Sequence, residues 1–301
     1  MAKIEFGISL RQSDNVVEEA REAETQGYDF LTAGEHMFFH GPTTNGLITL
    51  AGAAAATTRI RLMTSITLIP LYPAAVLAKQ IATLDRLSGG RFNLGVGVGG
   101  EYPKEFEACG VPVNQRGPRT DESLDVMIRL WTEDNVTYDG RFNKLSGVTL
   151  IPKPIQKPPP IWVSGRSDGA MKRTARFAQG WIPYMYTPEM LQKSVDKITG
   201  YSESRDSPVN PGIYLFFAVH EDPKRALKMC SEKLSTQYNQ DFSNLVGKYA
   251  LSGTPDQCIA RLNEYVESGA KTVILSSACP PDYMEENQRL LAKTVLPAFT
   301  D

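Results

Sequence analysis

The amino-acid sequence predicts an α/β protein, a single domain over residues 1–301 that forms a (β/α)8 TIM barrel with insertions at its C-terminal face. Two observations favour this fold. Strand and helix patterns alternate from the first residues to the last, and eight strand patterns can be distinguished. A chain of 301 residues with 42% hydrophobic residues also suits one large core. A doubly wound parallel sheet is the alternative, but it usually contains fewer strands.

Short apolar or alternating runs predict strands at residues 3–9, 28–33, 60–66, 92–98, 160–164, 181–184, 212–219 and 272–276. Helical periodicity predicts helices at residues 15–26, 47–57, 74–87, 120–131, 170–178 and 285–296. Gly27 ends the first helix and Pro297 ends the last, because both residues are common helix stops. The run Thr254-Pro255-Asp256-Gln257 resembles a capping box that begins the helix before the last strand.

Two segments are longer than ordinary connections. Residues 138–160 contain Asp139-Gly140, a hairpin signal, followed by a proline-rich run. The second segment lies between the last two strands and has a helical pattern over residues 222–237. We expect both segments to cover the mouth of the barrel.

Composition excludes several classes of function. A net charge of −2 with 22% charged residues gives no reason to expect nucleic acid or an anionic membrane as a partner. The four cysteines are far apart and form no Cys-x-x-Cys pair, which argues against a metal site and for a reducing compartment. We find neither a signal peptide nor an apolar run of about 18 residues, so we expect a soluble, cytoplasmic protein.

The segment 88–100 is the most informative part of the chain, because it predicts a turn, a buried strand and a glycine-rich end. Gly97, Gly99 and Gly100 follow the alternating strand residues. Glycine has no Cβ, so a flat molecule can approach such a backbone closely. Its position at the C-terminal end of a barrel strand indicates a seat for a planar cofactor, and a tight turn is the alternative.

Two other strand ends carry polar residues. Glu35-His36 ends the second strand, and a histidine there can donate or accept a proton near neutral pH. The fifth strand leads into Ser164-Gly165-Arg166-Ser167 before a helix, which indicates either a phosphate seat or a solvated loop with a helix cap. We find no Walker motif, dinucleotide fingerprint, His-Glu-x-x-His or Gly-x-Ser-x-Gly elsewhere.

Taken in order, these segments resemble the bacterial luciferase-like monooxygenase superfamily, which includes flavin-dependent and F420-dependent oxidoreductases. The resemblance covers essentially the whole chain. It rests on Glu35-His36, Ser65-Ile66 with Pro70, the block 88–100, Gly165-Arg166-Ser167, Gly180-Trp181-Ile182-Pro183 and Gly253-Thr254-Pro255.

The resemblance implies a barrel that binds FMN or the deazaflavin coenzyme F420 at its C-terminal mouth. It implies a catalytic role for His36 and a cis peptide bond at Ser65-Ile66. Cofactor contacts are implied at Ser65, Ile66, Gly97, Val98, Gly99, Gly165, Arg166 and Ser167. Bacterial luciferase has a phosphate-binding arginine where this chain has Val98. In the F420-dependent sugar-phosphate dehydrogenases a catalytic glutamate aligns with Gly100, so Glu101 is the candidate acid, one residue further on.

We therefore expect an oxidoreductase that uses reduced FMN to monooxygenate a small organic substrate. Hydride transfer with F420 is the alternative, and a flavin-binding protein without turnover is the second. A barrel lyase or aldolase would usually need a lysine at a strand end, and we find none. The apolar strand-end residues Phe6, Ile66, Leu68 and Trp181 suggest a lipophilic or aromatic substrate. A separate reductase would supply the reduced cofactor. The resemblance also implies a homodimer that pairs through helices beside the second and third strands, and the helix at 47–56 is rich in alanine and short of charge.

Overall fold

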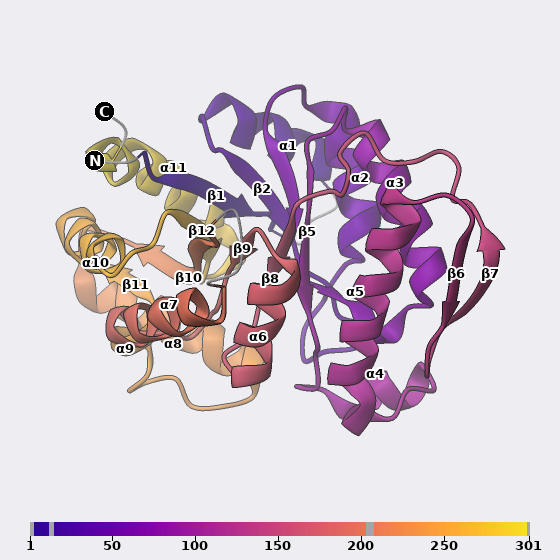
Figure 1. Cartoon of the computed structure of the whole chain (residues 1–301). Helices are drawn as coiled ribbons and strands as arrows, with labels where there is room; N and C mark the ends of the chain where they lie inside the picture. Colours follow the sequence, from indigo (N-terminus) through magenta and orange to yellow (C-terminus); the bar gives the residue numbers. More distant parts are fainter. Residues whose placement is uncertain (1–2, 12–14, 203–207, 300–301) are drawn as a thin grey trace.

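Parallel strands close into a barrel in the computed structural model, which describes residues 3–11, 15–202 and 208–299 (Figure 1). The eight barrel strands follow one another around the ring, and β9 pairs with β10 and β10 with β12 to close it. They are β1 (Glu5–Ser9), β2 (Phe30–Ala33), β3 (Arg61–Thr64), β5 (Phe92–Gly97), β8 (Ile161–Val163), β9 (Gly180–Trp181), β10 (Asn210–Val219) and β12 (Thr272–Ser277). The prediction of a parallel barrel is confirmed.

Helices cover the outside of the barrel, where the main core lies between helices and strands. They are α1 (Val16–Thr25), α2 (Gly46–Ala56), α3 (Ala74–Leu87), α5 (Arg116–Thr132), α6 (Asp168–Phe177), α7 (Pro188–Tyr201), α10 (Pro255–Glu267) and α11 (Met284–Thr294). Short 3-10 turns occur at Ile69–Leu71, Val113–Gln115, Pro281–Tyr283 and Leu296–Phe299. The predicted capping box at Thr254 is present. Sequence reasoning missed α7, although Thr187 caps it and Pro188 stands in its first turn.

The third and sixth predicted strands differ from the structure. β3 ends at Thr64, and β4 (Thr67–Leu68) continues the direction and pairs with β5. The Ser65–Ile66 peptide bond between them is cis, in agreement with the resemblance. β9 ends at Trp181, and a bridge between Tyr184 and Tyr214 extends its pairing with β10.

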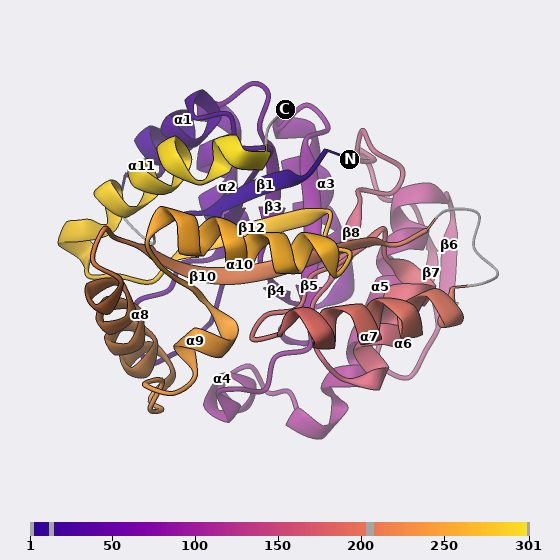
Figure 2. The ribbon, with the colours of Figure 1, turned by 90° about the vertical axis from the view of Figure 1, so that its left-hand side faces the viewer.

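Several insertions follow the C-terminal ends of strands and lie on the lower side of the molecule in both views (Figures 1 and 2). After β5 comes α4 (Pro103–Ala108). After β10 come α8 (Pro223–Tyr238), α9 (Val246–Tyr249) and the short strand β11 (Leu251–Gly253). The predicted insertion between the last two strands is therefore a helical one, and its α8 reaches the barrel mouth, as the contacts of Tyr238 below show.

The other insertion forms the predicted hairpin but does not cover the mouth, so that expectation is wrong. The hairpin strands β6 (Val136–Asp139) and β7 (Lys144–Val148) lie at the outer edge of the molecule beside α5 (Figure 1). The Glu122 carboxylate of α5 accepts backbone hydrogen bonds from Phe142 and Asn143 at 2.8 and 2.6 Å. The hairpin follows α5, which runs antiparallel to the strands and ends at the opposite face of the barrel, so the chain emerges far from the mouth.

Candidate functional site

The candidate site lies where the loops after β2, β3, β5 and β8 meet. In a parallel barrel, these loops all lie at the C-terminal face, where the active sites of such barrels are found. The loop after β2 brings His36, the loop after β5 brings Glu101, and the loop after β8 brings Arg166. The structure therefore gathers the three charged or titratable candidates at one face.

His36 is held by a carboxylate that the sequence did not reveal. Its Nδ1 atom lies 3.2 and 3.3 Å from the two carboxylate oxygens of Glu105. Glu105 is completely buried, and its Oε2 also accepts the backbone N–H of Met37 at 3.2 Å. A buried carboxylate favours a proton on Nδ1, so Nε2 of the neutral ring is left as an acceptor.

Glu105 reaches His36 because α4 folds back over the end of β2. Phe106, the next residue of this short helix, is fully buried and fixes it against the barrel. The ring of Phe39 stacks on the His36 ring, with centroids 4.2 Å apart and planes 14° apart. His36 is thus fixed from two sides, and its side chain remains 21% exposed.

Glu35, the neighbour of His36, is a buried structural carboxylate. It accepts hydrogen bonds from the Leu68 backbone at 3.0 Å, the Tyr72 hydroxyl at 2.9 Å and the Asn45 amide at 3.2 Å. Burial raises the pKa of Glu35, and these hydrogen bonds oppose that rise. Glu35 ties the loop after β2 to the segment after β3 and so holds the two loops that carry His36 and Ile66.

The Ser65–Ile66 step occupies the space that the glycines of β5 leave open. A Cβ at Gly97 would lie 1.8 Å from Cδ1 of Ile66, and a Cβ at Gly95 would lie 1.8 Å from the Thr64 carbonyl oxygen. The missing side chains therefore admit the Ile66 side chain and the backbone of the neighbouring strand. Ser65 and Ile66 are partly exposed, so they are the surface that a cofactor ring can meet, and direct contact with Gly97 stays a prediction.

After β5 the chain turns sharply through Val98, Gly99 and Gly100. Gly99 and Gly100 have φ values of +62° and +108°, which favour glycine. Val98, Gly99 and Gly100 are partly exposed, whereas Gly97 is buried. The segment therefore forms a tight turn, which was the alternative interpretation of these glycines. The same turn places Glu101 at the mouth of the barrel.

Arg166 has a guanidinium group without a fixed anion. Its Cζ lies 5.3 Å from the ring centroid of Tyr184, and within the described ranges it forms no ion pair. Gly165 has φ +123°, and the exposed Ser167 caps α6 by accepting the Ala170 N–H at 3.2 Å. The loop therefore combines a helix cap with a free arginine, and a free guanidinium fork fits phosphate oxygens.

Glu101 lies within electrostatic range of both His36 and Arg166. Partial burial by surrounding protein raises the pKa of Glu101, and the electrostatic influence of His36 and Arg166 opposes this rise. Its side chain still reaches solvent. A carboxyl group placed in this way can hold a proton at higher pH than an ordinary glutamate.

Most of the apolar strand-end residues do not face the site. Phe6 and Trp181 belong to the core behind the strands, and Leu68 is buried. Ile66 alone among the four keeps exposed surface. Three hydroxyl side chains point into the barrel: Ser9, Thr32 and Ser65 are joined by hydrogen bonds of 3.0 and 2.9 Å.

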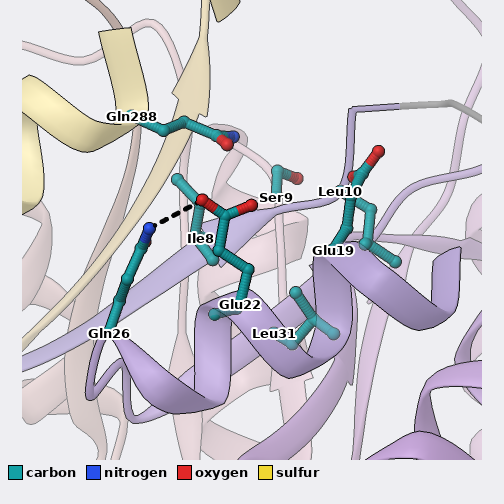
Figure 3. A pocket seen from close by; sticks show the side chains of 9 residues that line it. Ile8, Ser9, Leu10, Glu19, Glu22, Gln26, Leu31 and Gln288 are labelled. Atoms are coloured by element: carbon teal, nitrogen blue, oxygen red, sulfur yellow. Dashed lines mark hydrogen bonds between the residues drawn. The ribbon is translucent and has the colours of Figure 1, made fainter. Parts of the chain in front are cut away.

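A cavity elsewhere is too small to be the site. It lies between β1, α1 and α11, outside the barrel wall, and Figure 3 shows Glu22 and Gln26 hydrogen-bonded beside it. Its volume of about 10 Å³ is roughly the space of one water molecule. No group of three or more metal-ligating side chains occurs in the described part of the chain, where there is also no helix able to cross a membrane.

Comparison with known proteins relates the chain to oxidoreductases. A family model described as luciferase-like monooxygenase matches residues 5–272. The crystal structure of the monooxygenase RslO1 from Streptomyces bottropensis superposes with a TM-score of 0.85 at 25% identity, covering 99% of this chain and 100% of the other.

Curated relatives differ in cofactor. An uncharacterized protein of Mycobacterium tuberculosis is 34% identical over 172 residues, which are 57% of this chain and only 59% of the relative. An FMNH2-dependent dimethylsulfone monooxygenase of Pseudomonas putida is 29% identical over 224 residues, 71% of this chain and 60% of the relative. An F420-dependent glucose-6-phosphate dehydrogenase of Microbacterium testaceum is 26% identical, covering 91% of this chain and 90% of the relative.

Proposed function

Because the chain belongs to the luciferase-like monooxygenase family, we propose that it is an oxidoreductase that uses reduced FMN to monooxygenate a small organic substrate. The FMNH2-dependent dimethylsulfone monooxygenase among its relatives supports this choice of cofactor and reaction. A separate reductase would supply the reduced flavin, which is the two-electron donor for the reaction with oxygen.

The pair formed by His36 and Glu105 gives the strongest support for the proposal. Glu105 holds the Nδ1 proton, and Nε2 of His36 is then free to take a proton from a reacting group or return it. The stacking of Phe39 on the His36 ring also restrains its orientation. His36 therefore has the fixed orientation that a general acid–base residue requires, at the face of the barrel where such residues act.

The residues at the mouth fit FMN. The guanidinium of Arg166 is available to the phosphate, and the backbone at Gly165 carries no side chain there. The partly exposed Ser65–Ile66 step offers an apolar side chain and a backbone edge to the ring. Each part of the cofactor thus has a suitable neighbour among residues from separate loops, and roles for Gly97, Val98, Gly99 and Ser167 remain part of the proposal.

Glu101 supports F420-dependent hydride transfer as a second candidate. Its carboxyl group lies near His36, and partial burial raises its pKa. A carboxyl group of raised pKa near an imidazole suits a reaction in which hydride leaves one carbon and protons move separately. The F420-dependent relative covers nearly all of this chain, which also supports this alternative.

A homodimer is part of the proposal. Helix α2 carries no charged residue, and its Ile48 is 75% exposed. Val76 on the neighbouring α3 is 51% exposed. Two copies could cover these apolar side chains against each other, since α2 is rich in alanine and allows close approach.

The experiment is a comparison of His36→Gln with His40→Gln. His40 is in the same loop and contacts Phe39, but Glu105 does not bind it. Reduced FMN-loaded protein is mixed with oxygen and candidate substrates, and product is measured. We expect His36→Gln to lower turnover by about 10²-fold, within the usual range for a positioned acid or base, with FMN affinity nearly unchanged. Equal turnover in both variants would refute the role of His36.

A further inference from the structure

A continuous series of aromatic rings crosses the barrel mouth. It starts at Tyr214 in β10, and the successive ring-centroid distances are 5.5 Å to Phe216, 6.1 Å on to Tyr238 of α8, and 6.0 Å on to Phe39. Phe39 then stacks on His36 at 4.2 Å. Three of these contacts are edge-to-face, with interplanar angles of 75° to 83°, a preferred geometry of aromatic pairs.

Tyr238 lies at the middle of this aromatic wall. The charges of Glu101 and Arg166 both act on its hydroxyl, so it lies near the two charged residues of the mouth. Tyr238, Phe39 and Tyr214 are all partly exposed, although their neighbours Phe216 and Phe242 are buried. The exposed parts of these three side chains are surface that a molecule bound beside His36 can cover.

Tyr214, at the inner end of the aromatic wall, contacts the hydroxyl groups inside the barrel. The Tyr214 hydroxyl lies 3.2 Å from Oγ of Ser9, Ser9 lies 3.0 Å from Oγ1 of Thr32, and Ser65 donates to Thr32 at 2.9 Å. Each hydroxyl has one proton. If Ser65 donates to Thr32, Thr32 can donate to Ser9 and Ser9 to Tyr214, which leaves the Tyr214 proton for Ser276 or for a bound acceptor.

Tyr214 remains a donor over the whole neutral range. Burial raises the pKa of its hydroxyl, and hydrogen bonds to Ser9 and Ser276 oppose that rise. The mouth therefore has an aromatic wall with the Tyr214 hydroxyl at its inner end and His36 at its outer end.

We propose that the substrate is a compact aromatic molecule with one oxygen function, bound with its ring on the exposed parts of Phe39 and Tyr238 and its oxygen on the Tyr214 hydroxyl. This inference rests on the proposed function, because it places the substrate beside His36. A planar ring suits edge and face contacts with the wall, and an oxygen acceptor can take a hydrogen bond from the Tyr214 hydroxyl. A flexible chain would lose rotational freedom without gaining these contacts.

Three probes of eight carbon atoms each test separately whether binding requires the aromatic ring and whether it requires the oxygen acceptor. Acetophenone has a ring and a carbonyl, 2-octanone has the carbonyl without a ring, and ethylbenzene has the ring without an oxygen. Ligand-observed NMR titration gives their dissociation constants on the protein, both with and without FMN. We expect acetophenone to bind at least about tenfold more tightly than either of the others, since one hydrogen bond is worth about that factor.

Variants test the two ends of the site separately. Tyr214→Phe should weaken acetophenone by about tenfold and leave ethylbenzene unchanged, because only the hydroxyl is lost. Ser9→Ala, which interrupts the hydroxyl series, should weaken acetophenone in the same direction. Tyr238→Leu should weaken acetophenone and ethylbenzene but not 2-octanone. Tyr249→Leu is the matched control, since Tyr249 packs on the same cluster but has no ring contact with the wall.

Equal affinity of the protein for the three probes would overturn the inference. It would also be overturned if Tyr238→Leu had a normal melting temperature and still bound acetophenone more tightly than 2-octanone to the same degree. Titration of the protein with FMN and with F420 distinguishes a failure of this inference from a failure of the proposed function. If FMN binds but the probes show no preference, only the substrate inference fails. If neither cofactor binds while acetophenone is still preferred, the proposed function fails and the aromatic site stands.

Discussion

The Nδ1 atom of His36 lies 3.2 Å from Oε2 of Glu105, a carboxylate that is completely buried. The two residues are 69 positions apart in sequence and come from different loops. Their contact joins the end of β2 to α4, so the orientation of the candidate catalytic ring depends on how the insertion after β5 folds.

Replacing Glu105 should therefore impair His36 without touching the cofactor. Glu105→Gln keeps the shape but removes the negative charge that favours a proton on Nδ1. We expect turnover to fall about tenfold or more, as for the loss of a charged hydrogen bond. The ¹⁵N NMR signals of the His36 ring should show a changed distribution of the proton between Nδ1 and Nε2. The control is Glu107→Gln, an exposed residue of the same helix. A drop in stability with normal turnover and unchanged His36 signals would assign Glu105 a merely structural role.

The sequence predicted the barrel and the position of His36 but not Glu105. The barrel follows from the repeated alternation of strand and helix, and His36 from its place directly after a strand. Glu105 is one of two acidic residues in a polar helix of six residues, and only the packing of Phe106 shows that this helix is fixed. Such a contact depends on how a loop folds back, which local pattern does not encode.

The apolar strand-end residues were wrongly expected to face the substrate, and the reason is a different one. Both sides of a barrel strand are buried, so hydrophobicity does not reveal which side chains point inward. Phe6 and Trp181 point outward to the helices, and Ser9 and Tyr214 point inward. The hairpin after α5 was placed wrongly because the length of an insertion does not indicate the face from which it emerges.

The packing of Ile66 on Gly97 gives a second prediction. Gly97→Ala would put a Cβ 1.8 Å from Cδ1 of Ile66 in the present structure. We expect a loss of about 1–3 kcal/mol in the free energy of unfolding, typical of an overpacked core. The double variant Gly97→Ala/Ile66→Ala should lose less than the sum of the two single changes, because the methyl group then fills the space that Ile66 vacates. Denaturant unfolding measures all three variants, and strict additivity would show that the two side-chain positions do not compete.

Arg166 should bind the cofactor phosphate. Arg166→Ala should raise the FMN dissociation constant about tenfold or more, since a hydrogen bond to a charged group contributes about 1.5–3 kcal/mol. Riboflavin affinity should not change, because riboflavin has no phosphate. Arg141→Ala is a suitable control, because Arg141 is also exposed and stacked on an aromatic ring but belongs to the outer hairpin. Equal weakening of FMN and riboflavin by Arg166→Ala would place the arginine away from the phosphate.

The exposed Ile48 should lie in a dimer interface. Sedimentation at micromolar concentration should show a dimer for the unmodified protein and a monomer for Ile48→Glu, because a buried unpaired charge opposes association. Ile151→Glu is the matched control, as Ile151 is 73% exposed and follows the hairpin. A monomeric unmodified protein would contradict the proposed assembly.

Titration of the purified protein with FMN, riboflavin and F420 measures directly whether a cofactor binds beside His36. We expect saturable binding of FMN at one molecule per chain, at least about tenfold tighter than riboflavin because of the phosphate contact with Arg166. Tighter binding of F420 than of FMN would favour hydride transfer over monooxygenation while keeping the site. If neither FMN nor F420 binds to the folded protein, the assignment of a cofactor site beside His36 is contradicted.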